Sequence, residues 1–192
     1  MQLMLYGRLL MEMNRRHLIA VSAIMLIVVG CSEPDHAINP IVELTTTLGT
    51  IQLEMYIEDA PVSVENFIEY VESSFYDSTI IHRDIPGFII QGGQYKMDLT
   101  KKEANDPIIC ESDNGMLNLR GTIAVAPEVD PHSGTSQFFI NLVDNPALDK
   151  KNDTYAIGYA VFGRVVEGMN VVDAIANVPT STQEAPDEPT MN

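Results

Sequence analysis

The chain has 192 residues, of which 45% are hydrophobic and 20% charged, a composition typical of one globular domain with short additional segments. Its formal net charge of −16 at pH 7 argues against nucleic-acid binding, which needs an excess of Lys and Arg to neutralise phosphates. The acidic residues are instead expected to form a solvated surface that aids solubility.

A basic stretch followed by an apolar run lies near the N-terminus. Asn14–His17 carries the basic residues, and the apolar run Leu18–Val29 is too short to span a membrane comfortably. The residues at its end, Val28-Val29-Gly30-Cys31, resemble a bacterial lipobox. Residues 1–30 are therefore predicted to be a lipoprotein signal peptide, and Cys31 is predicted to carry the lipid.

The predicted location is the periplasmic side of a bacterial cell envelope, where the lipid on Cys31 would contact the membrane. Ser32 directly follows the cysteine and is the kind of residue that permits transfer to the outer membrane. An uncleaved anchor helix is the alternative, and it would also tether the domain outside the cytoplasm. Met13 is favoured as the start, because Met1–Glu12 would place a partly apolar extension before the basic residues.

The folded domain is predicted to cover residues 40–178, after a polar tether at residues 31–39. Ile41–Thr47 and Thr50–Tyr56 are rich in β-forming residues, and Leu48-Gly49 between them favours a hairpin. Apolar and polar residues alternate along the second segment. One face of this strand is therefore expected to be buried and the other solvated.

Two helices are predicted, one from Pro61 and one over Met169–Ile175. Pro61 suits the first turn of a helix, and Asp59 is in position to cap it. The apolar stripe of the first helix is assigned to the hydrophobic core and consists of Val64, Phe67, Ile68 and Val71.

A strand at Thr79–His82 leads into a turn at Pro86-Gly87 and a short buried strand at Phe88–Ile90. Gly92-Gly93 follows, and these glycines either turn the chain sharply or leave room for another backbone. The remaining segments are predicted as strands at Gly121–Ala126, Gln137–Asn141 and Tyr159–Val165, polar loops at Lys96–Leu119 and Asp130–Ser136, and a mobile tail at residues 179–192.

Many short strands with two isolated helices favour a mainly β fold, either an antiparallel barrel or a sandwich with helices packed on it. Serine-nucleophile, dinucleotide and P-loop motifs are absent from the sequence. His82 and His132 are not at metal-ligand spacing, so neither a metal nor a cofactor is expected. His82 is interpreted as a structural histidine. Cys110 would be the single cysteine left beside Cys31, so no intramolecular disulfide is predicted.

Three motifs together resemble the cyclophilins, in their bacterial periplasmic branch. They are His82-Arg83 with Phe88–Gly93, the segment Gly134–Ile140, and Val161–Val165 followed by Gly168-Met169. The resemblance covers about Ile41–Pro179. It implies an eight-stranded antiparallel barrel capped by two helices, and peptidyl-prolyl cis-trans isomerisation of proline-containing polypeptides. The protein is expected to be a monomer.

The resemblance also assigns roles to individual residues. Arg83 matches the catalytic arginine, whose permanently charged guanidinium can donate a hydrogen bond to the proline nitrogen as the amide twists. Gln91 and Gln137 match the amides that orient substrate carbonyls, and the backbone at Val125 matches a segment that pairs with the peptide. The complete set implied to bind substrate is Phe88, Ile89, Gln91, Ala124, Val125, Ala126, Gln137, Phe139, Leu148 and Tyr159. Taken singly, the apolar members would be core residues and Arg83 a surface arginine.

Three departures from the family pattern matter. Ala147 stands where a tryptophan or another large aromatic is usual, which predicts an open pocket rim and weak cyclosporin binding. Pro127 lacks an N–H and has a fixed φ, so it is expected to stiffen or redirect the edge of the binding groove. The final strand, which in the family pairs with the first, is missing. The strand at Ile41–Thr47 is therefore expected either to have an unpaired edge or to be covered by another segment.

Two functions remain open from the sequence. The leading one is a lipid-anchored envelope isomerase that assists the folding of exported or unfolded proteins. The alternative is a catalytically weak, cyclophilin-like module that binds proline-containing peptides. Ala147 and the missing strand favour the alternative, whereas the intact set around Arg83 favours the enzyme.

Overall fold

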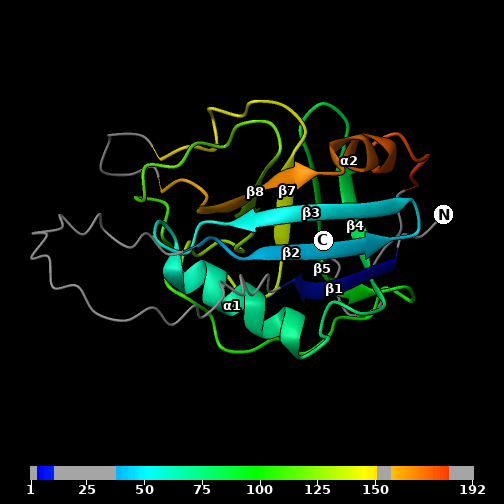
Figure 1. Cartoon of the computed structure of the whole chain (residues 1–192), viewed down its shortest axis with the longest axis horizontal. Helices are drawn as coiled ribbons and strands as arrows, with labels where there is room; N and C mark the ends of the chain where they lie inside the picture. Colours follow the sequence, from blue (N-terminus) through cyan, green and yellow to red (C-terminus); the bar gives the residue numbers. More distant parts are fainter. Residues whose placement is uncertain (1–3, 11–37, 151–156, 182–192) are drawn as a thin grey trace, which may run out of the picture.

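Eight strands pair side by side into a closed barrel in the part of the chain that the computed structural model describes, residues 4–10, 38–150 and 157–181. Figure 1 shows the sheet with helix α1 along one side and helix α2 at the opposite edge. All the pairings are antiparallel, in the order β1-β2-β3-β8-β6-β7-β5-β4. The strands are β1 Met4–Leu10, β2 Ile41–Thr46, β3 Gly49–Met55, β4 Thr79–Ile85, β5 Ile89–Lys96, β6 Thr122–Val125, β7 Phe138–Asn141 and β8 Val161–Glu167.

The hairpin of β2 and β3 forms as its sequence predicts. Thr46 pairs with Gly49 across the turn, and the Oγ1 of Thr46 donates to the carbonyl oxygen of Gly49 at 2.8 Å. Along β3, Ile51, Leu53 and Met55 are buried while the residues between them are not. The mainly β class with two helices is confirmed by this arrangement.

Helix α1, Pro61–Glu72, begins at the predicted proline, but its N-terminus is capped differently from the prediction. The residue preceding it, Ala60, makes no side-chain capping bond. Instead Glu111, from a distant loop, accepts hydrogen bonds from the N–H of Val62 at 3.0 Å and the N–H of Ser63 at 2.7 Å. A carboxylate at this end of a helix is stabilising because it satisfies free N–H groups and faces the positive end of the helix dipole. The prediction of Asp59 as the cap is therefore wrong.

Strand β5 is longer than predicted, because the two glycines lie inside it. Gly93 has a φ of +105°, and a Cβ at this position would lie 2.4 Å from the carbonyl oxygen of Ser136. Only glycine permits so close an approach of two backbones. Of the two roles expected for Gly92-Gly93, room for another backbone is confirmed for Gly93 and a sharp turn is not.

Strand β1 covers the edge of β2, so the expectation of an unpaired edge is wrong and its alternative, coverage by another segment, is confirmed. Six residues pair with β2, from Leu5 with Thr46 to Leu10 with Ile41. On the other side only two pair with β4, Met4 with Ile80 and Leu5 with Thr79. No strand follows β8 among residues 157–181. The barrel is therefore closed by a segment that the sequence assigned to a signal peptide.

The later elements follow the predictions to within a few residues. Strands β6, β7 and β8 lie where they were predicted, and helix α2, Met169–Ile175, has the predicted bounds. The lipobox at Cys31 and residues 182–192 of the predicted tail lie outside the described residues. Those predictions therefore stay predictions.

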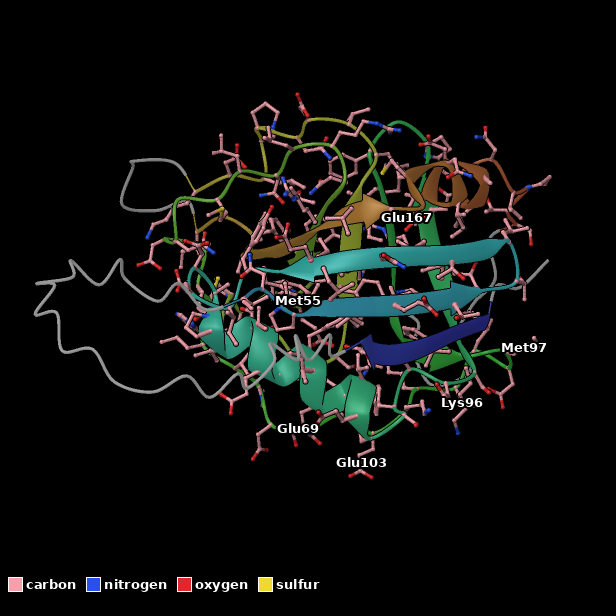
Figure 2. The ribbon with its side chains drawn as sticks, in the orientation of Figure 1. Met55, Glu69, Lys96, Met97, Glu103 and Glu167 are labelled. Carbon is pink, nitrogen blue, oxygen red and sulfur yellow. The ribbon has the colours of Figure 1, made fainter. Side chains whose placement is uncertain are left out.

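Acidic side chains project from the outside of the barrel. Figure 2 shows Glu69 on α1 and Glu103 in the loop after β5 pointing away from the sheet, and both are exposed. This arrangement fits the solvated acidic surface expected from the net charge. No helix within the described ranges is long and apolar enough to cross a membrane.

Candidate active site

Four predicted site residues lie in one row across neighbouring strands. Arg83 on β4 pairs with Gln91 on β5, Gln91 pairs with Phe139 on β7, and Phe139 pairs with Ala124 on β6. Neighbouring strands lie about 4.8 Å apart, so the row extends over roughly 15 Å. Residues from four separate segments are thus brought together by sheet register.

A buried apolar cluster, here called the Phe139 cluster, is built around this row and is separate from the main core. Its buried members are Ile89, Ala124, Ala126, Phe139 and Val161, and the half-buried residues packed on it are Tyr56, Phe88, Met116 and Leu148. Six of these nine residues were predicted to bind substrate. The sequence missed Tyr56, Met116 and Val161 as members, although Val161 belongs to one of the motifs.

The polar side of the row is a continuous chain of hydrogen bonds. Arg83 Nη1 donates to Gln91 Oε1 at 3.1 Å, and Gln91 Nε2 donates to Gln137 Oε1 at 2.9 Å. Gln137 Nε2 then donates to Gln94 Oε1 at 2.8 Å. Arg83 is exposed and the three glutamines are half-buried. The sequence predicted every member of this chain except Gln94.

His82 precedes the arginine and lies mostly buried against the ring of Tyr95, with 4.6 Å between ring centroids. The pKa of His82 is lowered from 6.5 to about 4, mainly by burial and next by the charge of Arg83. A hydrogen bond with the side chain of Gln137 opposes this shift in the pKa. The imidazole is therefore neutral at pH 7 and cannot act as a second cation beside Arg83.

Tyr159 lies at the edge of the Phe139 cluster. Its ring packs edge-on against Phe139 with a centroid distance of 5.5 Å, and 37% of the residue is exposed. The N–H of Tyr159 donates to the carbonyl oxygen of Leu148 at 2.9 Å, so these two predicted residues are held together. The exposed edge can contact a bound chain.

The loop that carries Leu148 is held by buried asparagines. Asn145 Nδ2 donates to the carbonyl oxygen of Phe88 at 3.1 Å and to Asn141 Oδ1 at 2.7 Å. The N–H of Leu148 donates to the carbonyl oxygen of Asn145 at 2.9 Å. Asn145 therefore connects Phe88 and Leu148, on two sides of the Phe139 cluster, through their backbones.

Ala147 is exposed, as expected for an open rim. The side chain of Val125 packs in the main core, and its N–H donates to the carbonyl oxygen of Ala160 at 3.0 Å. Any pairing of a peptide with Val125 must therefore use the carbonyl group. The N–H that the family pattern offers at this position is already bonded within the barrel.

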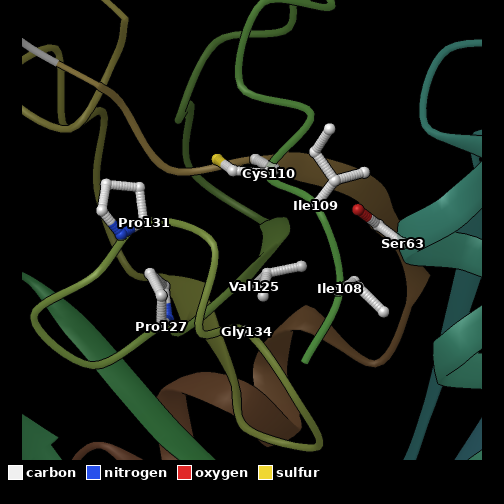
Figure 3. Close-up of a pocket in the computed structure, with 9 residues that line it drawn as sticks. Ser63, Ile108, Ile109, Cys110, Val125, Pro127, Pro131 and Gly134 are labelled. Carbon is white, nitrogen blue, oxygen red and sulfur yellow. The ribbon is translucent and has the colours of Figure 1, made fainter. Parts of the chain in front are cut away.

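A small apolar cavity lies beside Val125, under the loop that contains Pro127 and Pro131 (Figure 3). Its volume is about 10 Å³, enough for one water molecule and too small for a substrate side chain. Cys110 lines the cavity as a free thiol. Within the described residues, no three His, Cys, Asp or Glu side chains are grouped as metal ligands.

The site can therefore hold an apolar ring and donate hydrogen bonds, but it shows no nucleophile with a base beside it. A guanidinium only donates, and the side chains next to it are amides and a neutral imidazole. Such a site suits a reaction in which no bond is broken and only a dipole or lone pair changes.

Comparison with known proteins identifies the family. Residues 41–191 match the family described as "Cyclophilin type peptidyl-prolyl cis-trans isomerase/CLD". This chain is a cyclophilin. The match covers well over half of the 192 residues and leaves β1 outside it. The activity class is peptidyl-prolyl cis-trans isomerisation.

Bacterial cyclophilins are among the most similar relatives. The chain is 49% identical to the "Peptidyl-prolyl cis-trans isomerase" of Acinetobacter baylyi, over 80% of this chain and 84% of that protein. It is 44% identical to "Peptidyl-prolyl cis-trans isomerase A" of Dickeya dadantii, over 92% of this chain and 94% of the relative. The assignment to the bacterial branch rests on these identities.

Solved cyclophilin structures share the fold. A cyclophilin of Cryptosporidium parvum is 25% identical and superimposes with a TM-score of 0.58, covering 76% of this chain and 89% of that one. A second structure of that protein was determined with the dipeptide Ala-Pro. Cyclophilin AquaCyp293 of Hirschia baltica, at 22% identity and a TM-score of 0.61, supports the fold alone.

Proposed function

We propose that this cyclophilin isomerises X-Pro bonds with Arg83 as its catalytic residue, on polypeptides exported to the bacterial cell envelope. The observation that carries the catalytic role is the row that sets the Arg83 guanidinium beside Gln91 and the Phe139 cluster. The proline ring packs on the cluster through Phe88, Phe139 and Leu148. Gln91 and Gln137 hydrogen-bond the carbonyl groups next to it.

The proposed chemistry needs no covalent intermediate. Twisting the X-Pro amide removes its resonance and leaves a basic lone pair on the proline nitrogen. The uncatalysed rotation has a barrier of about 20 kcal/mol. The Arg83 guanidinium donates a hydrogen bond to that lone pair only in the twisted state. Interactions that exist only in the transition state lower the barrier, and a reduction of about 7 kcal/mol gives roughly a 10⁵-fold acceleration.

The test of the catalytic role is an isomerisation assay on an Xaa-Pro peptide with the full chain and with Arg83→Ala. Removing the donor should lower kcat/KM by about 10²-fold or more, with KM changed much less. Arg164→Ala is the matched control, because Arg164 is exposed and paired with Glu54 on the far strands β8 and β3. Full activity in Arg83→Ala would reject the role given to this residue.

The envelope location is supported by the leader pattern that ends in Val28-Val29-Gly30-Cys31. A lipid on Cys31 would hold the domain against a membrane, where newly exported chains present unfolded X-Pro bonds. Metabolic labelling with a fatty acid in a bacterial host should modify the parent and Cys110→Ala, but not Cys31→Ala. Equal labelling of Cys31→Ala would contradict the lipidation.

The second candidate is a peptide-binding module with weak turnover. The exposed Ala147 and the N–H of Val125, which is bonded to Ala160, both reduce the contacts offered to a bound chain. The two candidates predict different activities for the unsubstituted protein. Peptide binding without measurable acceleration would favour the module, whereas acceleration that is lost in Arg83→Ala favours the enzyme.

A further inference from the structure

Gln94 ends the hydrogen-bond chain that starts at Arg83. It lies on β5, three residues after Gln91, and its Oε1 accepts the 2.8 Å hydrogen bond from Gln137 Nε2. The side chain of Gln94 is hydrogen-bonded to Gln137, whereas that of Arg83 is hydrogen-bonded to Gln91. Any effect of Gln94 on the guanidinium must therefore pass through Gln137 and Gln91.

The charge of Arg83 fixes the direction of the whole chain. A guanidinium has donors and no acceptor, so Gln91 must turn its oxygen toward Arg83 and its NH₂ group toward Gln137. Gln137 must then accept from Gln91 with its oxygen and donate with its nitrogen. An acceptor is needed at the far end, and Gln94 Oε1 supplies it. The three amides thus have one consistent orientation.

The orientation of the Gln137 amide depends on the acceptor at Gln94. The Gln137 amide has a partner on each side, because its oxygen accepts from Gln91 and its nitrogen donates to Gln94. If the acceptor at Gln94 were removed, the NH₂ group of Gln137 would lose its partner within the barrel. The Gln137 amide could then rotate and turn its NH₂ group toward Gln91 Nε2, in place of the oxygen that now accepts from it, which loosens the support of Arg83.

We propose that Gln94 is a positioning residue of the isomerase site, which sets the orientation of Gln137 and Gln91 and thereby holds the Arg83 guanidinium in place. This inference rests on the catalytic role proposed for Arg83. Gln94 acts as a hydrogen-bond acceptor and needs no contact with the substrate.

The test compares two substitutions of equal length. Gln94→Met removes the acceptor and keeps the shape, whereas Gln94→Glu keeps an acceptor oxygen at the end of the chain. One hydrogen bond of ordinary strength changes a rate by about three- to tenfold, so kcat for an Xaa-Pro peptide should fall by that factor in Gln94→Met. Gln94→Glu should remain within about twofold of the parent.

Gln52→Met is the matched control, because Gln52 is a half-buried glutamine on β3, outside the site. Its kcat should equal that of the parent. A direct readout does not depend on activity: the side-chain amide resonances of Gln137 and Gln91 in ¹H–¹⁵N spectra should shift in Gln94→Met, together with the Arg83 Nε–H resonance. Gln52→Met should leave all three unchanged.

The outcomes separate this inference from the catalytic role of Arg83. If Arg83→Ala is inactive and Gln94→Met keeps the full kcat with unshifted resonances, the positioning role is overturned and the role of Arg83 stands. If Gln94→Glu is as slow as Gln94→Met, the acceptor is not what matters and the inference also fails. If Arg83→Ala stays fully active, the catalytic role fails, and unshifted Gln137, Gln91 and Arg83 resonances would overturn the positioning role as well.

Discussion

His82 and Arg83 are adjacent in sequence yet have opposite relations to water. The guanidinium is exposed and always charged, whereas the imidazole is buried between Tyr95 and the polar chain and stays neutral at pH 7. The burial that keeps His82 neutral has a thermodynamic consequence. Folding disfavours the protonated imidazole, so protons bind more tightly to the unfolded chain.

The sign of this linkage gives a pH dependence of stability. The folded pKa of His82, about 4, lies below the unfolded value of 6.5, so its full contribution to folding is present above pH 6.5. As the pH falls from 6.5 to 4, up to about 3 kcal/mol of the free energy of unfolding is lost. Urea titrations across this range should show a shallower pH slope in His82→Gln than in the parent. An unchanged slope would contradict the burial of the imidazole.

Ala147 makes a prediction about ligand binding at the rim of the Phe139 cluster. It is exposed, at the position where the family usually has a large aromatic residue. Ala147→Trp should therefore increase cyclosporin affinity by about tenfold or more, because an indole ring adds buried area and a donor N–H. Isothermal titration would measure this, with Val143→Trp, at another exposed position of the same loop, as the control. Tight binding by the parent would contradict the open rim.

Helix α1 depends on a residue that is far from it in the sequence. Glu111 accepts from the N–H groups of Val62 and Ser63 and from the Ser63 hydroxyl at 2.7 Å. Glu111→Ala leaves all three donors without this partner and should lower the free energy of unfolding by about 2 kcal/mol. Glu111→Gln should recover part of the loss, and Glu128→Ala, at an exposed loop position, should have little effect. Chemical denaturation would measure all three.

At the level of elements, local patterns predicted most strands and helices because their periodicity matches their burial. The β2–β3 hairpin, α1 and α2 are examples. The end of β5 was predicted too early, because two consecutive glycines indicate a strand boundary. Gly93 is required by the close approach of the Ser136 backbone, and nothing in the local sequence indicates that neighbour. The cap of α1 was missed for the same reason, since Glu111 lies 48 residues beyond Ser63.

Most of the site residues were predictable because they fall in motifs. The residues that pack against them or hydrogen-bond to them were not predictable. Gln94 lies directly after the Gln91–Gly93 motif, but its role depends on Gln137, which lies 43 residues further along the chain. Met116 and Tyr56 join the Phe139 cluster from a loop and from the residue after β3. Such contacts arise only when the strands are in register.

At the scale of the whole molecule, residues 4–10 close the barrel as β1, but they also fall within the predicted signal peptide, which would be removed. Cleavage before Cys31 would remove β1 and leave the edges of β2 and β4 unpaired. A chain that starts at Ser32 should therefore melt at least about 5 °C below the full chain, because it loses six paired positions on β2. Equal melting temperatures would show that β1 adds no stability.

The sequence could not predict β1, because Met4–Leu10 lies outside the family match and far along the chain from both of its partners. Residues 11–40 separate it from β2, whereas antiparallel neighbours commonly need only a few connecting residues. Its pairing is therefore a property of the assembled barrel.

The uneven pairing of β1 also affects the order in which the barrel folds and opens. Its partners on β4 follow it by more than 70 residues, so this pairing closes a longer stretch of chain than the pairing with β2. The β1–β4 seam, with two paired residues, closes late in folding and is where native-state opening should begin. Amide hydrogens of Thr79 and Ile80 should therefore exchange with deuterium sooner than those in the middle of β5–β7.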